Sequence, residues 1–230
     1  MTAGRHRLFT ADRIYRDLVI GLLVVFGIVP VLNHLLHSTK ADTYLVTAFL
    51  VFALFEITRR RSDLFIGLAF GLPAVASGFV NAATPDSPLL NVGPVAMSGV
   101  FLAYLIVTIL RDVFSGRRVS SEQIFGAVAA YLLIGLLFAI IYGFIALVDP
   151  HAFTYNEAIA SHLGSAEAER GLGVSTYFSF ITMTTLGYGD ITPVSSAARG
   201  FAWFQAVLGQ LYIAITIAAL VANHIAKKSS

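Results

Sequence analysis

The chain has 230 residues, of which 57% are hydrophobic and only 12% are charged. A soluble domain carries about twice that charged fraction, so the composition predicts an integral membrane protein. The absence of cysteine excludes disulfides and thiolate metal sites, and a net charge of +2 gives no electrostatic support for binding nucleic acid.

Six apolar stretches are long enough, or nearly long enough, to cross a membrane as helices. A helix needs about 20 apolar residues to cross the hydrocarbon core, and the second and third stretches lie at the short limit. The third also contains Pro73 and three glycines, which a helix in a membrane bundle tolerates because its neighbours satisfy the freed carbonyls. The six predicted spans are residues 18–36, 41–57, 64–80, 89–110, 124–147 and 198–226.

The basic residues predict the orientation of these spans. If the six spans alternate in direction, twelve of the fifteen Lys and Arg residues fall on one side of the membrane. An excess of positive charge marks the cytoplasmic side, so we predict a multi-pass protein of the cell membrane with both termini in the cytoplasm. The other side holds Lys40, Arg170 and Arg199, and also the longest polar stretch, residues 148–173.

The fourth span carries no charge that could sense the membrane potential. A voltage-sensing helix carries repeated arginines through the membrane field. Residues 89–110 contain no arginine, and Arg111 follows only at the end of the span. We therefore predict a protein that is not steeply voltage-dependent.

The segment between the fifth and sixth spans predicts a short helix followed by an irregular return. Residues 174–184 are too few to cross the bilayer, and Gly187 and Gly189 disfavour continuation of the helix. Such re-entrant backbone persists at membrane depth only if it is buried in protein or lines water. Successive backbone carbonyls can replace the hydration shell of a permeating cation without a full negative charge. The short helix would point its negative C-terminal end towards that cation.

The return resembles the Thr-Val-Gly-Tyr-Gly selectivity filter of the potassium channel family. The matching residues here are Thr185, Leu186, Gly187, Tyr188 and Gly189. The resemblance implies that K+ binds to the backbone carbonyls of the first four and to the Thr185 hydroxyl. Leucine stands where the family usually has valine. Only the carbonyl faces the ion, so selectivity should survive, but leucine lacks the β-branch and could change the stability of the filter.

The resemblance extends over residues 124 to about 226 and implies further site residues. Thr184 and Asp190 flank the filter at the family's positions and would support it, as would Tyr177 and Phe178, which match an aromatic pair packed around it. Gly209 falls where the family has a hinge glycine in its last helix. A glycine in a membrane helix is also a common close-packing site, so both interpretations stay open.

Three other functions are weighed against a potassium channel. Gly187 to Asp190 also fit the Gly-x-Gly-Asp motif of intramembrane aspartyl proteases, but these need a second aspartate in a Tyr-Asp pair, which this sequence lacks. A weakly selective cation pore is disfavoured by Tyr188, which non-selective relatives usually lose. A non-conducting sensor or scaffold built from the first four spans would leave the filter sequence unexplained.

The predicted architecture is an all-α membrane protein with a re-entrant helix and filter between the fifth and sixth of its six membrane helices. One filter strand cannot enclose an ion, so we expect a homotetramer with closed symmetry. Its partners would be three further copies of itself and membrane lipid, with no nucleic acid. We expect no cofactor and no enzymatic activity, with K+ as the permeant ion. The predicted domains are a cytoplasmic tail (residues 1–17), a four-helix bundle without gating charges (18–118) and a pore domain (119–230).

Overall fold

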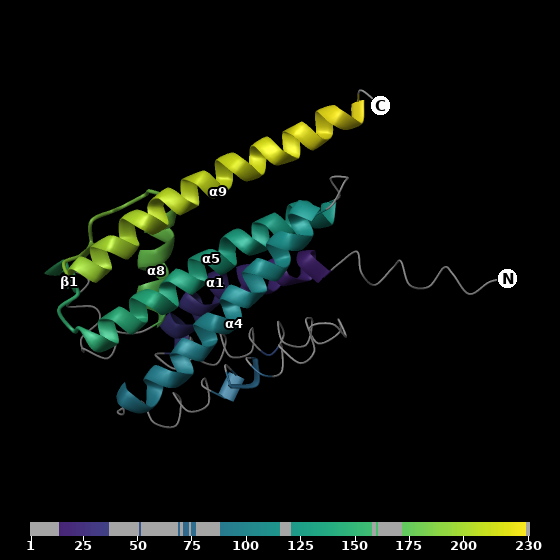
Figure 1. Cartoon of the computed structure of the whole chain (residues 1–230). Helices are drawn as coiled ribbons and strands as arrows, with labels where there is room; N and C mark the ends of the chain where they lie inside the picture. The colour runs from purple at the N-terminus through teal and green to yellow at the C-terminus, as the bar shows by residue number, and fades with distance from the viewer. Residues whose placement is uncertain are drawn as a thin grey trace.

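The computed structural model describes residues 14–36, 51, 69, 71–73, 75–76, 88–115, 121–157, 160 and 172–228. Long helices dominate this part of the chain, together with two short strands (Figure 1). In chain order the elements are α1 (Ile14–Leu36), α4 (Pro88–Ser115), α5 (Ser121–Val148), β1 (Phe153–Tyr155), α8 (Leu172–Met183), β2 (Ile191–Pro193) and α9 (Ser196–Lys228).

Four of the six predicted spans coincide with described helices, namely α1, α4, α5 and α9. The predicted spans at residues 41–57 and 64–80 lie almost entirely outside the described residues. Three described stretches are long and apolar enough to cross a membrane: Val95–Phe114, Ser121–Val148 and Ser196–Ala219. They fit a helical membrane protein, whereas the count of six spans and the side of the termini stay predictions.

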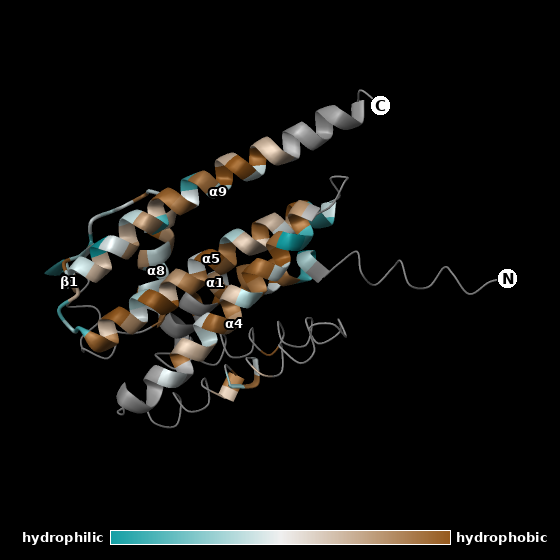
Figure 2. Cartoon of the chain, in the orientation of Figure 1, coloured by the Kyte–Doolittle hydropathy of each residue, from teal (hydrophilic) through white to brown (hydrophobic). Residues whose placement is uncertain are grey.

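Helix α5 lies at the centre of the fold. It packs against α1, α4, α8 and α9, and hydrophobic colour covers most of its length in Figure 2. A helix that is apolar all round is expected to be buried all round. Accordingly, 61% of the most apolar 18-residue window of α5 is buried, compared with 17% of the corresponding window of α9. Most of the apolar stretch Ser196–Ala219 is therefore not buried by the described part of the chain.

Gly135 allows α8 to approach α5 closely. A Cβ atom on Gly135 would lie 2.6 Å from the ring of Phe180 in α8, which is shorter than any ordinary contact. Beside this contact, the Ser179 hydroxyl donates a hydrogen bond of 2.6 Å to the Gly135 carbonyl. Small residues at membrane helix contacts permit this kind of close approach. Helix α8 is thus seated on α5 by both packing and a hydrogen bond.

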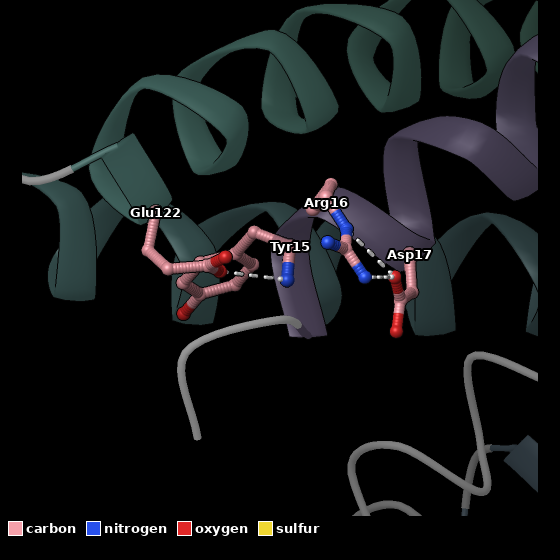
Figure 3. A network of polar contacts seen from close by, with 4 residues as sticks. All are labelled: Tyr15, Arg16, Asp17 and Glu122. Carbon is pink, nitrogen blue, oxygen red and sulfur yellow. Dashed lines mark hydrogen bonds and ion pairs between the residues drawn. The ribbon is translucent and has the colours of Figure 1, made fainter. Parts of the chain in front are cut away.

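Polar contacts fasten the start of α1 to the two helices beside it. The backbone N–H of Tyr15 donates to Glu122 Oε2 at 3.2 Å, and its hydroxyl donates to Asp112 Oδ2 at 2.6 Å. The first N–H groups of a helix lack partners within the helix, and a carboxylate there also suits the helix dipole. The exposed Arg16–Asp17 pair beside them, at 2.9 Å, adds little because water screens it (Figure 3).

A small antiparallel sheet, which the sequence analysis did not predict, joins the loop after α5 to the segment before α9. Strands β1 and β2 pair with Phe153 opposite Pro193 and Tyr155 opposite Ile191. The Ala152 carbonyl continues the pairing, accepting the N–H of Val194 at 2.7 Å. The structure therefore corrects the predicted all-α class, because it contains this two-stranded sheet as well as helices. The sheet holds the segment that follows residues 185–189 against the rest of the fold.

Candidate functional site

The end of α8 holds the return through backbone hydrogen bonds. The Ile181 carbonyl accepts two of them, from Leu186 N–H at 2.9 Å and from Gly187 N–H at 3.1 Å. The Thr185 N–H bonds to the Thr182 carbonyl at 3.0 Å. These bonds satisfy carbonyls that a helix end leaves without partners. At 12 residues, α8 is about 18 Å long and too short to cross a bilayer.

The backbone of the return alternates in handedness. The φ angles of Thr185, Gly187 and Gly189 are +58°, +52° and +77°, and Thr185 is the only non-glycine residue with positive φ in the described part of the chain. In an ordinary strand successive carbonyls point to opposite sides, whereas a left-handed residue at every second position turns them to the same side. Positive φ in a β-branched threonine is a strained conformation of the kind that gathers at functional sites.

The return is open to its surroundings in a single chain. Every residue from 184 to 189 is exposed. The side chains of Leu186 and Tyr188 are 55% and 67% exposed. Apart from the two chain neighbours of each glycine, a Cβ placed on Gly187 or Gly189 would meet no atom of the described residues within 4 Å. The described part of the chain therefore leaves residues 184–189 exposed.

Asp190 anchors the far end of the return. Its Oδ2 accepts a hydrogen bond from the Tyr177 hydroxyl, and its Oδ1 accepts the N–H of Ile191 at 3.0 Å. Its carbonyl accepts the N–H of Asn156 at 2.9 Å, next to β1. Both carboxylate oxygens thus accept hydrogen bonds, one from the Tyr177 side chain and one from the backbone. The role of Asp190 at the mouth of a filter stays a prediction.

The Tyr177 phenol keeps its proton in this setting. It belongs to α8, outside the three candidate membrane-spanning stretches. The pKa of Tyr177 is raised to about 12. Desolvation is the largest cause, and the hydrogen bond to Asp190, the negative charge of Asp190 and the charge of Tyr188 contribute less. The hydroxyl therefore remains a donor to Asp190 at every physiological pH.

Tyr177→Phe is expected to loosen this end of the return. A hydrogen bond to a charged group contributes about 1.5–3 kcal/mol when it is shielded, and partial exposure of Tyr177 places the loss at or below the lower end. We expect potassium flux in reconstituted vesicles to fall several-fold, with little change in the helix content measured by circular dichroism. Tyr131→Phe, in α5, is the matched control because it keeps the ring that packs beside Tyr212, and it should keep wild-type flux. Unchanged flux in Tyr177→Phe would show that the bond to Asp190 is dispensable.

The remaining predicted residues lie on both sides of the return. The Thr185 hydroxyl donates to the Thr184 carbonyl at 2.7 Å, so its oxygen lone pairs stay available to a cation. The Thr184 hydroxyl donates back to the Phe180 carbonyl at 2.7 Å. Phe178 is buried, and its ring lies 4.9 Å from that of Tyr142 and 5.2 Å from that of Phe153. Phe178 thus braces α8 against α5 and β1, whereas Tyr177 reaches the return itself.

Gly209 is a close-packing site in this structure. A Cβ on Gly209 would lie 2.6 Å from the backbone oxygen of Met183, the last residue of α8. Any larger residue would push α9 away from the base of the return. This contact is the close packing expected of a glycine in a membrane helix, and the hinge role of Gly209 stays a prediction.

Three buried polar residues near the return were not singled out by the sequence analysis. Tyr142, Ser179 and Gln205 form a buried hydrogen-bonded chain between α5, α8 and α9. The available signal was the presence of single polar side chains in apolar segments, because such residues face protein or water rather than lipid. Which polar residues meet depends on the rotation of each helix, and spacing along the sequence does not give it.

The comparisons with known proteins agree with this geometry. Residues 131–223 match the family model described as Ion channel. The match supports an ion channel family. It begins within α5, ends within α9 and includes α8 and the whole return. Neither a curated protein nor a solved structure matches the chain. The ion channel domain and the three apolar stretches support passive ion conduction by a membrane protein.

Proposed function

We propose that the protein is a homotetrameric potassium-selective channel that passes ions passively down their gradient. The observation that carries the proposal is the alternating handedness of residues 185–189 at the end of α8. It lies within the segment that matches the ion channel family model.

Selectivity would arise from backbone oxygens held at fixed positions. A potassium ion entering the filter gives up its water, and the carbonyls of residues 185–188 with the Thr185 hydroxyl replace it. These oxygens carry only partial charge, so the ion can also leave. The C-terminal end of α8 adds a partial negative charge beneath the filter, which favours a cation there.

The exposure of the return supports assembly from several copies. A single strand contacts an ion from one side only, and closed symmetry of four copies about one axis surrounds it. In one chain Leu186 and Tyr188 are largely exposed, and only 17% of the most apolar 18-residue window of α9 is buried. Three further subunits would supply the missing neighbours, and lipid would cover the remaining apolar surface.

The direct test is ion flux in vesicles reconstituted with the purified protein. We expect uptake driven by a potassium gradient, little uptake under the equivalent sodium gradient, and block by barium. Comparable permeability to both ions would reject selectivity and leave a weakly selective cation pore. No flux of either ion from intact tetramers would reject the channel function. The Gly187→Ala variant serves as the non-conducting control.

Conduction is expected to depend weakly on voltage. Among its 28 residues, α4 contains a single basic residue, Arg111, near its C-terminal end. Moving one elementary charge through the membrane contributes about 2.3 kcal/mol per 100 mV, and steep gating requires several such charges per subunit. In a planar bilayer with symmetric potassium, we expect a shallow conductance–voltage curve that Arg111→Gln leaves unchanged. A steep curve would contradict the prediction.

A further inference from the structure

A chain of three hydrogen bonds crosses the interior between α5, α8 and α9. The Tyr142 hydroxyl donates to Gln205 Oε1 at 2.7 Å, and Gln205 Nε2 donates to Ser179 Oγ at 2.7 Å. Ser179 Oγ in turn donates to the Gly135 carbonyl at 2.6 Å. The three side chains are buried, with exposures of 1%, 0% and 0%. We call these residues the buried relay.

A relay of this kind restricts how three helices fit together. An apolar side chain in place of Gln205 would fill the space without needing a partner. The Gln205 amide instead needs two partners on different helices: its oxygen accepts from Tyr142 on α5, and its nitrogen donates to Ser179 on α8. Both bonds form only at one rotation of the three helices about their axes and one position along them. Buried polar networks that are fully satisfied select a single arrangement in this way. The relay therefore fixes geometry more sharply than apolar contact does.

The relay acts one helical turn from the base of the filter. Ser179 precedes Met183, the last residue of α8, by four residues, and Gln205 precedes Gly209 by four residues in α9. Ser179 meets Gln205 by a hydrogen bond, and Gly209 closely approaches the Met183 backbone. Residues four apart share one face of a helix, so α8 and α9 run in the same direction along this two-point contact.

The last turn of α8 transmits this placement to the filter. Ile181 lies between Ser179 and Met183, and its carbonyl holds the N–H groups of Leu186 and Gly187. A rotation of α8 would shift that carbonyl and the two filter residues bonded to it. We propose that Gln205 is a positioning residue, which acts through Ser179 to set the geometry of the filter carbonyls and thereby the ion selectivity. The inference rests on the proposed potassium channel function.

Gln205→Met tests the relay with a side chain of similar length and no hydrogen bonds. We expect the sodium-to-potassium permeability ratio, taken from reversal potentials in planar bilayers, to rise about fivefold, the equivalent of one ordinary hydrogen bond. Ser179→Ala should produce a similar rise. The double variant should have the same permeability ratio as either single variant, because each substitution already removes the hydrogen bond between Gln205 and Ser179. Additive effects in the double variant would overturn a role that acts through Ser179.

Potassium-dependent thermal stability provides a second measurement that does not require conduction. Wild-type tetramers in detergent should unfold at a higher temperature in potassium than in sodium, and Gln205→Met should lose most of this difference. The control is Leu102→Ala, which leaves a cavity where a fully buried side chain of α4 stood. It should lower the unfolding temperature equally in both salts and keep the wild-type permeability ratio.

The outcomes separate this inference from the channel function. Assembled Gln205→Met tetramers with the wild-type ratio and the wild-type potassium effect would overturn the positioning role while the channel stands. If wild-type tetramers pass no potassium, the channel function fails, and the thermal comparison decides the positioning role by itself. If Gln205→Met does not assemble, Tyr142→Phe replaces it. Tyr142→Phe removes only one hydroxyl. If it has the wild-type permeability ratio and the wild-type potassium effect, the positioning role of Gln205 is likewise overturned.

Discussion

Gly187→Ala is expected to abolish potassium flux while leaving the helices intact. Gly187 has a φ of +52°, and apart from its two chain neighbours no described residue has an atom within 4 Å of an added Cβ. The cost is therefore conformational, about 1–2 kcal/mol in each subunit, or roughly 4–8 kcal/mol over four copies. An alanine relieves this strain by returning to negative φ, which turns its carbonyl out of the row. Flux into reconstituted vesicles under a potassium gradient measures the loss.

The neighbouring residue supplies the control for this prediction. Leu186 has no positive φ, and only its backbone is expected to face the ion. Leu186→Val should therefore keep potassium flux within a few-fold of wild type, and circular dichroism should show the same helix content in both variants. If Gly187→Ala conducts as well as Leu186→Val does, the alternating backbone is not the conducting element.

Gly209→Ala is expected to reduce both the stability of the protein and its potassium flux. The new methyl group would lie 2.6 Å from the Met183 backbone oxygen. Overpacking of this kind costs about 1–3 kcal/mol at each site, and separation of α9 from α8 would disturb the filter base. We expect a lower unfolding temperature and at least a tenfold loss of flux. Thermal unfolding in detergent and vesicle flux measure the two effects.

The same helix offers a matched control. Gly200 also lies in α9, and a Cβ on it would meet no atom within 4 Å. Gly200→Ala should leave the unfolding temperature unchanged or slightly raised. Adding Met183→Ala to Gly209→Ala should not restore flux, because the closest contact is with backbone rather than side chain. A hinge would give the opposite pattern, in which Gly209→Ala keeps its stability and changes only channel opening.

The sequence predicted the helices well where hydrophobicity alone defines them. The predicted spans at residues 89–110 and 124–147 lie inside α4 and α5, because an uninterrupted apolar stretch has few alternatives to a helix in a membrane. The short helix was predicted at residues 174–184 and found at Leu172–Met183. The position of the return followed from the same pattern, since Gly187 and Gly189 cannot extend a helix without cost.

Long-range contacts were out of reach of the sequence for a physical reason. The pairing of Phe153 with Pro193 joins two strands that lie some 40 residues apart in the chain. Each strand has three residues, which is too short to show the alternation of apolar and polar residues that predicts a strand. The packing of Gly209 on Met183 and the bond from Gln205 to Ser179 depend on helix rotation. Hydrophobic period fixes which face of a helix is buried only when the other face is polar. These helices are apolar on nearly all sides.

The uncovered return also bears on how the protein is made. In the proposed tetrameric channel, a newly inserted subunit can leave the exposed surface of α9 in contact with lipid tails, because these are as apolar as its side chains. It cannot do the same with the backbone of residues 185–189, since lipid offers that backbone no hydrogen bonds. Encounters between subunits, rather than helix insertion, would then limit the rate of maturation. The yield of finished protein should rise faster than in proportion to the rate of synthesis, and isolated subunits should be short-lived in the membrane.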